Sequence, residues 1–119
     1  MQWTEKDYRK MDTAIKKGYE FFSESPEKSV NYWWQVWTKI NNYNKKNGSR
    51  SFYTVLDGWS GWDTSPVTWM TDFEDAFVNY GRLDQRITYC ETMLKNYDDI
   101  SNVSRRIINN TLASAYLEK

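Results

Sequence analysis

The sequence contains no histidine and only one cysteine, Cys90, among its 119 residues. Without histidine the chain cannot form a Ser-His or Cys-His nucleophile pair, and it lacks the commonest general base and a common zinc ligand. A lone cysteine cannot close an intramolecular disulfide, which excludes the disulfide frameworks of small extracellular domains. We therefore expect a non-enzymatic, cytoplasmic protein that holds no metal and no cofactor.

Excess charge of one sign and long apolar runs are absent too. The 16 Lys and Arg residues balance the 16 Asp and Glu residues, so the basic surface that non-specific nucleic-acid binding requires is missing. No stretch approaches the 18 consecutive apolar residues of a membrane span, and residues 1–7 are polar where a signal peptide needs an apolar core. We expect neither a nucleic-acid partner nor a membrane association.

Proline is scarce, and both prolines directly follow a serine. Ser25-Pro26 and Ser65-Pro66 have the pattern of an N-cap followed by proline at the first helical position. Thr4 is followed three residues later by Asp7, which is a variant of the capping box. These pairs predict three helix starts.

Apolar residues recur at spacings of three and four along most of the chain, and no segment alternates with period two. The pattern predicts one all-α domain of five or six helices, built as a bundle or as an array of antiparallel hairpins. The polar segment 41–49, which contains Gly48, is expected to end the second helix, and Gly81 to end the helix that starts at Pro66. The expected parts are a hairpin over about 4–45, a short helix and tryptophan-rich loop over about 50–65, a hairpin over about 66–98 and a final helix over about 103–118.

Aromatic residues are abundant: seven tryptophans, nine tyrosines and five phenylalanines stand beside only five leucines. The densest cluster, residues 32–37, could form a stacking platform for bases, sugars or a proline-rich peptide. We favour the other interpretation, in which large rings fill the core in place of leucine, with Trp34 and Trp37 packed between helices. Cys90 lies on an apolar stripe and is interpreted as a buried structural thiol.

The loop DGWSGWD, residues 57–63, is more open to a functional interpretation. Trp59 and Trp62 form a candidate ligand loop for a carbohydrate or a nucleobase, or they anchor the loop to the hairpins. The flanking Asp57 and Asp63 have the residue type of glycosidase carboxylates, but their spacing in a loop does not fix their separation. We favour turn positions for both.

The acidic residues at 72, 74 and 75 lie near a helix start, where carboxylates complement the helix dipole. A metal site would require a second oxygen cluster nearby, and Asp98-Asp99 is the single candidate. We do not predict a metal site here.

The last helix resembles the first helix of a tetratricopeptide repeat, because Leu112, Ala113 and Tyr116 match its leucine, small residue and tyrosine. The hairpin over about 66–98 is similar to a degenerate copy, and two of its residues depart from the pattern. Glu74 occupies the small-residue position and Arg86 replaces the usual alanine. The matching residues of this hairpin are Phe73, Phe77, Gly81, Cys90, Met93 and Leu94.

The N-terminal hairpin can be laid over the same scheme, with Gly18 as the small residue and Phe21 as the aromatic residue. Val30, Trp34 and Trp37 would then be the packing residues of the second helix. The resemblance covers about two thirds of the chain, with an insertion across the DGWSGWD loop.

This resemblance implies a concave surface that binds a protein or peptide, and hence a non-enzymatic interaction module. The residues carried onto that surface are Asp12, Ile15, Tyr19, Thr71, Asp75, Asn79, Asn110, Ser114 and Glu118. Two alternatives remain open: a small-ligand binder that uses the Trp59 and Trp62 loop, and a structural or oligomerisation domain of a larger protein. The final helix carries Ile107, Ile108, Leu112 and Leu117, more than one neighbour can cover, so a homodimer through this helix is a further expectation.

Overall fold

A computed structural model of the chain describes residues 3–119 and confirms the predicted all-α fold. The described residues form five α-helices and one short 3₁₀ helix, and they contain no strand. In chain order these are α1 (Glu5–Phe21), α2 (Pro26–Lys46), η1 (Leu56–Gly58), α3 (Pro66–Tyr80), α4 (Leu83–Asn96) and α5 (Asn102–Glu118).

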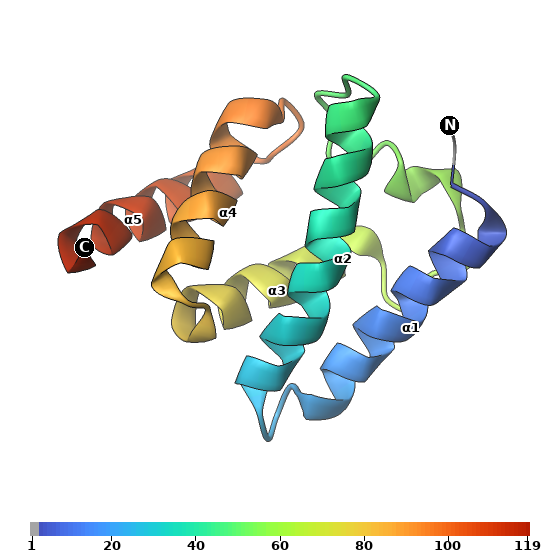
Figure 1. Cartoon of the computed structure of the whole chain (residues 1–119), viewed down its shortest axis with the longest axis horizontal. Coiled ribbons are helices and arrows are strands. Elements are labelled where there is room, and N and C mark those ends of the chain that lie inside the picture. Colours follow the sequence, from blue (N-terminus) through green and yellow to red (C-terminus); the bar gives the residue numbers. More distant parts are fainter. Residues whose placement is uncertain (1–2) are drawn as a thin grey trace.

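Helix α2 lies at the centre of the arrangement (Figure 1). It packs against α1 on one side and against α3 on the other, while α4 packs against α5. Helices α1 and α5 therefore lie at opposite ends of the molecule, which measures 42 × 35 × 22 Å. The segment between α2 and α3 returns to the start of α1, where η1 lies.

The sequence signals for helix starts correspond to capping interactions. Thr4 and Asp7 form a complete capping box at α1, and the Ser65 side chain accepts a hydrogen bond from the backbone N–H of Thr68 at α3. Ser101 caps α5 in the same way. Ser25 precedes α2 as predicted, but its side chain makes no capping hydrogen bond, so Pro26 is the effective start signal.

Helix α2 ends at Lys46, within the polar segment 41–49 where the sequence predicts its end. Residues 41–46 remain helical because their polar side chains have partners: Asn41 bonds to the Trp37 carbonyl, and the buried Asn44 donates to the hydroxyl of Tyr97. Gly48 lies just beyond the C-cap Asn47, and its φ of +64° is the left-handed conformation of a Schellman motif. Both hydrogen bonds of that motif are present, from Gly48 N to Lys45 O and from Ser49 N to Asn44 O.

Gly81 ends α3 as predicted, but for a different reason. Its φ is −73°, an ordinary extended value. A side chain there would lie 2.6 Å from the Phe77 carbonyl oxygen and 2.7 Å from the Phe77 ring. Glycine is thus required for space, and the expected left-handed cap is absent.

The aromatic cluster of α2 forms the core, which confirms the favoured interpretation. Trp33 has no exposed surface, and its Nε1 donates to the Ile15 carbonyl of α1. Trp34 is half-buried and stacks on Phe77 of α3, with ring centroids 5.2 Å apart. Trp37 is buried and donates to the sulfur of Met93 in α4. These rings join α2 to its neighbours.

The two hairpins pack differently. Gly18 of α1 faces Trp33 so closely that an added Cβ would lie 2.1 Å from the indole nitrogen. Between α3 and α4, where the tetratricopeptide pattern has small residues, Glu74 is buried and accepts a hydrogen bond from Tyr89, whose ring packs on Phe73 and Phe77. Large side chains thus separate α3 from α4.

Candidate functional site

The predicted ligand loop is anchored to α1. Trp59 stacks on the ring of Tyr8 with centroids 5.6 Å apart, and Trp62 meets the same ring edge-on. The Trp62 indole also donates to the Leu56 carbonyl of η1. Both tryptophans are half-buried, and Trp59 borders a shallow depression beside charged residues of α1. Ligand contact by this loop stays a prediction.

Two residues carried over by the resemblance make internal contacts on α1. Asp12 is buried, accepts the backbone N–H of Asp63 at 3.0 Å and pairs with Lys16, so it fastens the tryptophan loop to the helix. The hydroxyl of Tyr19 donates to Asp72 of α3 at 2.6 Å. Partial burial, and then this hydrogen bond, raise the pKa of Tyr19. Both side chains therefore stabilise the fold.

Helices α3 and α5 face each other across a hollow of about 280 Å³, which we call the α3–α5 groove. Thr71, a predicted site residue, lines the groove on the α3 side together with Val67, and Ser104 lines it on the α5 side. Met70 of α3 and Met93 of α4 add flexible apolar surface. The lining of the groove thus combines apolar side chains with hydroxyl groups and with the carboxyl groups of Glu74 and Asp99.

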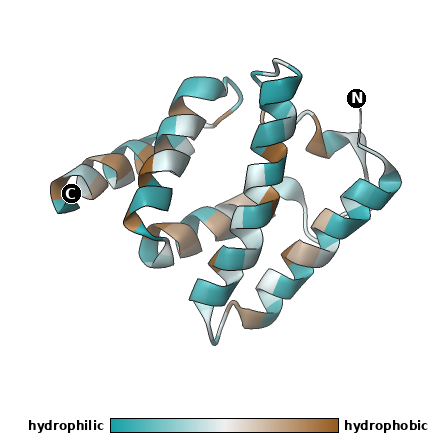
Figure 2. Ribbon diagram, in the orientation of Figure 1, coloured by the Kyte–Doolittle hydropathy of each residue, from teal (hydrophilic) through white to brown (hydrophobic). Residues whose placement is uncertain are grey.

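The exposed apolar side chains of the described residues gather on the two helices that border this groove. Val103, Ile107, Asn110, Ser114 and Leu117 follow one another at spacings of four and three, so the two predicted residues Asn110 and Ser114 share one face of α5, the α5 stripe, with three exposed apolar side chains. Figure 2 shows hydrophobic segments among hydrophilic ones along this helix. Within residues 3–119, the exposed large hydrophobic side chains are Val67, Tyr80, Val103, Ile107, Tyr116 and Leu117.

The other predicted residues of these helices have local partners. Asp75 and Asn79 are exposed on α3 one and two turns beyond Thr71, and Asn79 donates to the Asp75 carbonyl. Glu118 forms an ion pair with Arg86 of α4. On α1, the predicted residue Ile15 is buried in the core. The structure therefore brings Thr71 into the groove and places Asn110 and Ser114 on the exposed surface of α5.

Glu74 is a buried carboxyl group at the groove. Burial raises its pKa, and the hydrogen bond from Tyr89 opposes that rise only in part. The same burial, followed by the nearby Glu74 charge, raises the pKa of Tyr89 well above its ordinary value. The folded state therefore binds a proton at Glu74 more tightly than the unfolded chain does.

Replacing Glu74 by glutamine is expected to increase stability at neutral pH. The amide keeps an acceptor for Tyr89 and removes the cost of burying a charge. Because the folded-state pKa of Glu74 is raised, the charged carboxylate lowers the free energy of unfolding of the wild type above that pKa. This penalty disappears as the pH falls and the carboxyl group becomes protonated. Urea denaturation at about pH 7 and about pH 4 checks this, with the gain confined to neutral pH. An equal gain at both pH values would contradict it.

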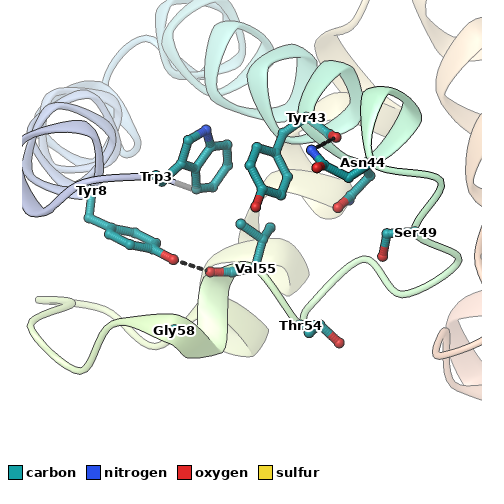
Figure 3. Close-up of a pocket in the computed structure, with 9 residues that line it drawn as sticks. Trp3, Tyr8, Tyr43, Asn44, Ser49, Thr54, Val55 and Gly58 are labelled. Carbon is teal, nitrogen blue, oxygen red and sulfur yellow. Dashed lines mark hydrogen bonds between the residues drawn. The ribbon is translucent and has the colours of Figure 1, made fainter. Parts of the chain in front are cut away.

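A second hollow, of about 350 Å³, lies where the start of α1, the end of α2 and the segment before α3 meet (Figure 3). We call it the aromatic–amide cavity. Figure 3 shows the rings of Trp3 and Tyr43 side by side, and the Tyr8 hydroxyl directed at the Val55 carbonyl. The lining residues are Trp3, Tyr8, Tyr43, Asn44, Asn47, Ser49, Thr54, Val55 and Gly58.

None of these lining residues was predicted as a site residue, although Gly58 belongs to the predicted ligand loop and part of the signal was present. An antiparallel hairpin brings the start of its first helix beside the end of its second, so Trp3 could have been placed near Tyr43. The segment 49–58 could not be placed, because its position depends on hydrogen bonds to residues near 98 in the chain.

The groups that could support chemistry or metal binding are dispersed. Cys90 is fully buried, and burial raises its pKa to about 11, so its thiol stays protonated. Among residues 3–119, no three acidic or thiol groups come close enough to hold a metal ion. No helix in this part of the chain has the length and apolar character needed to cross a bilayer.

Comparisons with protein-family models, curated proteins and solved structures give no match to this chain.

Proposed function

We propose that the protein is a non-enzymatic interaction module that binds a peptide segment of a partner protein in the α3–α5 groove. The observation that carries this proposal is the confinement of exposed large hydrophobic side chains, within the described residues, to α3 and α5. Val67, which is 62% exposed, lines the groove itself, and the others, such as Val103 at 66%, lie outside its lining on the same two helices. Exposed apolar side chains gathered in this way are typical of an interaction surface.

The groove suits a peptide with an apolar anchor residue. Met70 and Met93 can adapt to different anchors, and the hydroxyls of Thr71 and Ser104 offer hydrogen bonds to a peptide backbone. Helix-in-groove and extended-peptide recognition both rely on such anchors. A tetratricopeptide-like arrangement is part of this proposal, supported by α2 packing against both α1 and α3. We also place the module in the cytoplasm, which the free, buried Cys90 supports.

A pair of matched threonine variants tests the proposal. Thr71 in the groove and Thr13 on α1 are both exposed, and each hydroxyl donates to the carbonyl four residues earlier. Peptides selected from a random display library on the wild-type protein should lose about tenfold or more in affinity for Thr71→Glu, because the substitution adds bulk and charge at the groove. Thr13→Glu should bind them as the wild type does. Fluorescence anisotropy measures both affinities.

Selected peptides that bind both variants equally would contradict the groove as their site, and so would a selection that yields no binder. A homodimer through the α5 stripe is the second candidate, favoured by Leu117 at 89% exposed. Light scattering distinguishes it: a mass of one chain, 14.3 kDa, at high protein concentration excludes the dimer.

A further inference from the structure

We propose that the aromatic–amide cavity is a binding site for a neutral, hydroxyl-rich ring such as a pyranose sugar. This site is separate from the α3–α5 groove and shares no lining residue with it. A volume of about 350 Å³ falls in the range of small-molecule sites. Its described lining combines aromatic rings with amides and hydroxyls, and it contains no Asp, Glu, Lys or Arg side chain.

The absence of charged side chains from the described lining selects a neutral ligand, because a charged group in the cavity would lose hydration without gaining a counter-ion. The rings of Trp3 and Tyr43 lie 4.8 Å apart at 46°, and Trp3 also meets Tyr8 edge-on. These tilted rings do not form two parallel walls, which a flat base would need for stacking on both faces. They form a bent apolar surface on which the C–H face of a sugar can lie.

The amide groups of the cavity favour a ligand that donates hydrogen bonds. Asn44 is 1% exposed, and its Nδ2 donates to the hydroxyl of Tyr97, which itself donates to Asn41. Within the described residues, Asn44 Oδ1 has no hydrogen-bond partner, and such a buried acceptor is costly. A ligand hydroxyl supplies the donor that this oxygen lacks.

Asn47, which is exposed, also has an amide nitrogen that donates within the protein and an amide oxygen that is available to a ligand. Its Nδ2 donates to the Tyr43 carbonyl, and no described residue donates to its Oδ1. The hydroxyl of Thr54 donates to Ser51 and keeps its lone pairs for a second partner. The cavity thus offers several acceptors, which matches the many O–H donors of a sugar better than the one or two N–H groups on the edge of a base.

The two tryptophans of the loop pack behind Tyr8, a residue of the cavity wall. Trp59 and Trp62 do not line the cavity, and they pack against the ring of Tyr8, whose hydroxyl is bonded to the Val55 carbonyl. These contacts fix the position of the Tyr8 ring in the cavity wall. We infer that Trp59 and Trp62 position Tyr8 for the ligand and do not themselves contact it, whereas Gly58 of the same loop lines the cavity.

Two half-buried tyrosines of α2 provide a matched test. Tyr43 lines the cavity, whereas Tyr32 stacks on Phe21 near the opposite end of the helix. The full chain is titrated with a panel of methyl pyranosides and, separately, with nucleosides, and binding is followed by NMR of the tryptophan indole N–H groups. At least one pyranoside should give saturable shifts at Trp3. Its affinity should fall about tenfold in Tyr43→Leu and stay unchanged in Tyr32→Leu.

Three outcomes would overturn the proposal. They are no saturable shift with any pyranoside, nucleoside binding without pyranoside binding, and shifts centred on Trp59 that persist in Tyr43→Leu. Thermal unfolding of both leucine variants shows whether the fold is kept. If Tyr43→Leu is unfolded, Thr54→Val replaces it, because Thr54 is exposed and the substitution removes a cavity hydroxyl without removing a core ring.

Discussion

Alanine at position 18 is expected to destabilise the protein by about 3 kcal/mol, in the upper range for overpacked cores. The new methyl group would lie 2.1 Å from the Trp33 indole nitrogen and 2.5 Å from the adjoining ring carbon. Trp33 cannot move away easily, because it has no exposed surface and packs on Tyr19 and Phe73. A shift of the ring would also break its hydrogen bond to the Ile15 carbonyl. Urea denaturation measures the loss.

Gly48→Ala is the control, because it isolates the backbone effect. Gly48 has a φ of +64° and open space around it, so alanine there should cost only about 1 kcal/mol. Gly18 is helical and has no such φ, so its whole cost comes from the contact with Trp33. Equal losses in the two variants would show that α1 and α2 are not in close contact at this point.

The second large effect is expected at Asp99, which organises the segment after α2. Its carboxylate accepts hydrogen bonds from the backbone N–H groups of Phe52 and Tyr53 and from the Ser51 hydroxyl. Asp99→Ala leaves these donors without their charged acceptor. We expect it to lower the free energy of unfolding by about 2 kcal/mol, a value that allows for the solvent exposure of the carboxylate. Phe52 is fully buried and packs edge-on against Tyr97, so the loss reaches the core.

Asp98→Ala is the matched control for Asp99→Ala. Asp98 pairs with Arg50, but both side chains are mostly exposed, at 68% and 60%. Exposed ion pairs contribute little to stability. We therefore expect a clear fall in the melting temperature for the Asp99 variant and almost none for the Asp98 variant. The reverse order would refute this role of Asp99.

Acid titration provides an independent check of Asp99. Partial burial alone would raise its pKa, but the hydrogen bonds from Phe52, Ser51 and Tyr53 lower it below the ordinary 3.8. A carboxyl group with a lowered folded-state pKa contributes stability that is present above pH 3.8 and is lost as the pH falls through the folded-state pKa. Asp99→Ala should therefore weaken the acid sensitivity of the wild type in that range.

The sequence predicted the parts of the fold that depend on local patterns. Thr4, Ser65 and the two prolines marked helix starts because capping requires particular residues at fixed offsets. The apolar spacing placed Trp34 and Trp37 between helices for a similar reason. The polar segment with Gly48 marked the end of α2, but the hydrogen bond from Asn44 to Tyr97 that supports its last turns joins distant residues and could not be inferred from spacing.

The candidate sites were harder to predict than the fold. Asp12 lies on the expected helix, yet it is buried under a loop whose path could not be inferred from spacing. Thr71 lines the α3–α5 groove, but the other residues carried onto α3 and α5, which are Asp75, Asn79, Asn110, Ser114 and Glu118, do not. The aromatic–amide cavity is lined by three segments that are distant in the sequence, and no local sequence pattern predicts that they lie together.

The shallow attachment of α5 has a dynamic consequence. Of its 17 residues only Ile108 and Ala115 are buried, and it packs against α4 alone among its close neighbours. Local opening of such a helix requires far less free energy than global unfolding. One wall of the α3–α5 groove is thus the least anchored helix, while the other wall, α3, belongs to the core. Occupancy of the groove would therefore slow amide exchange in α5 more than in α3, which makes the order of α5 a readout of binding.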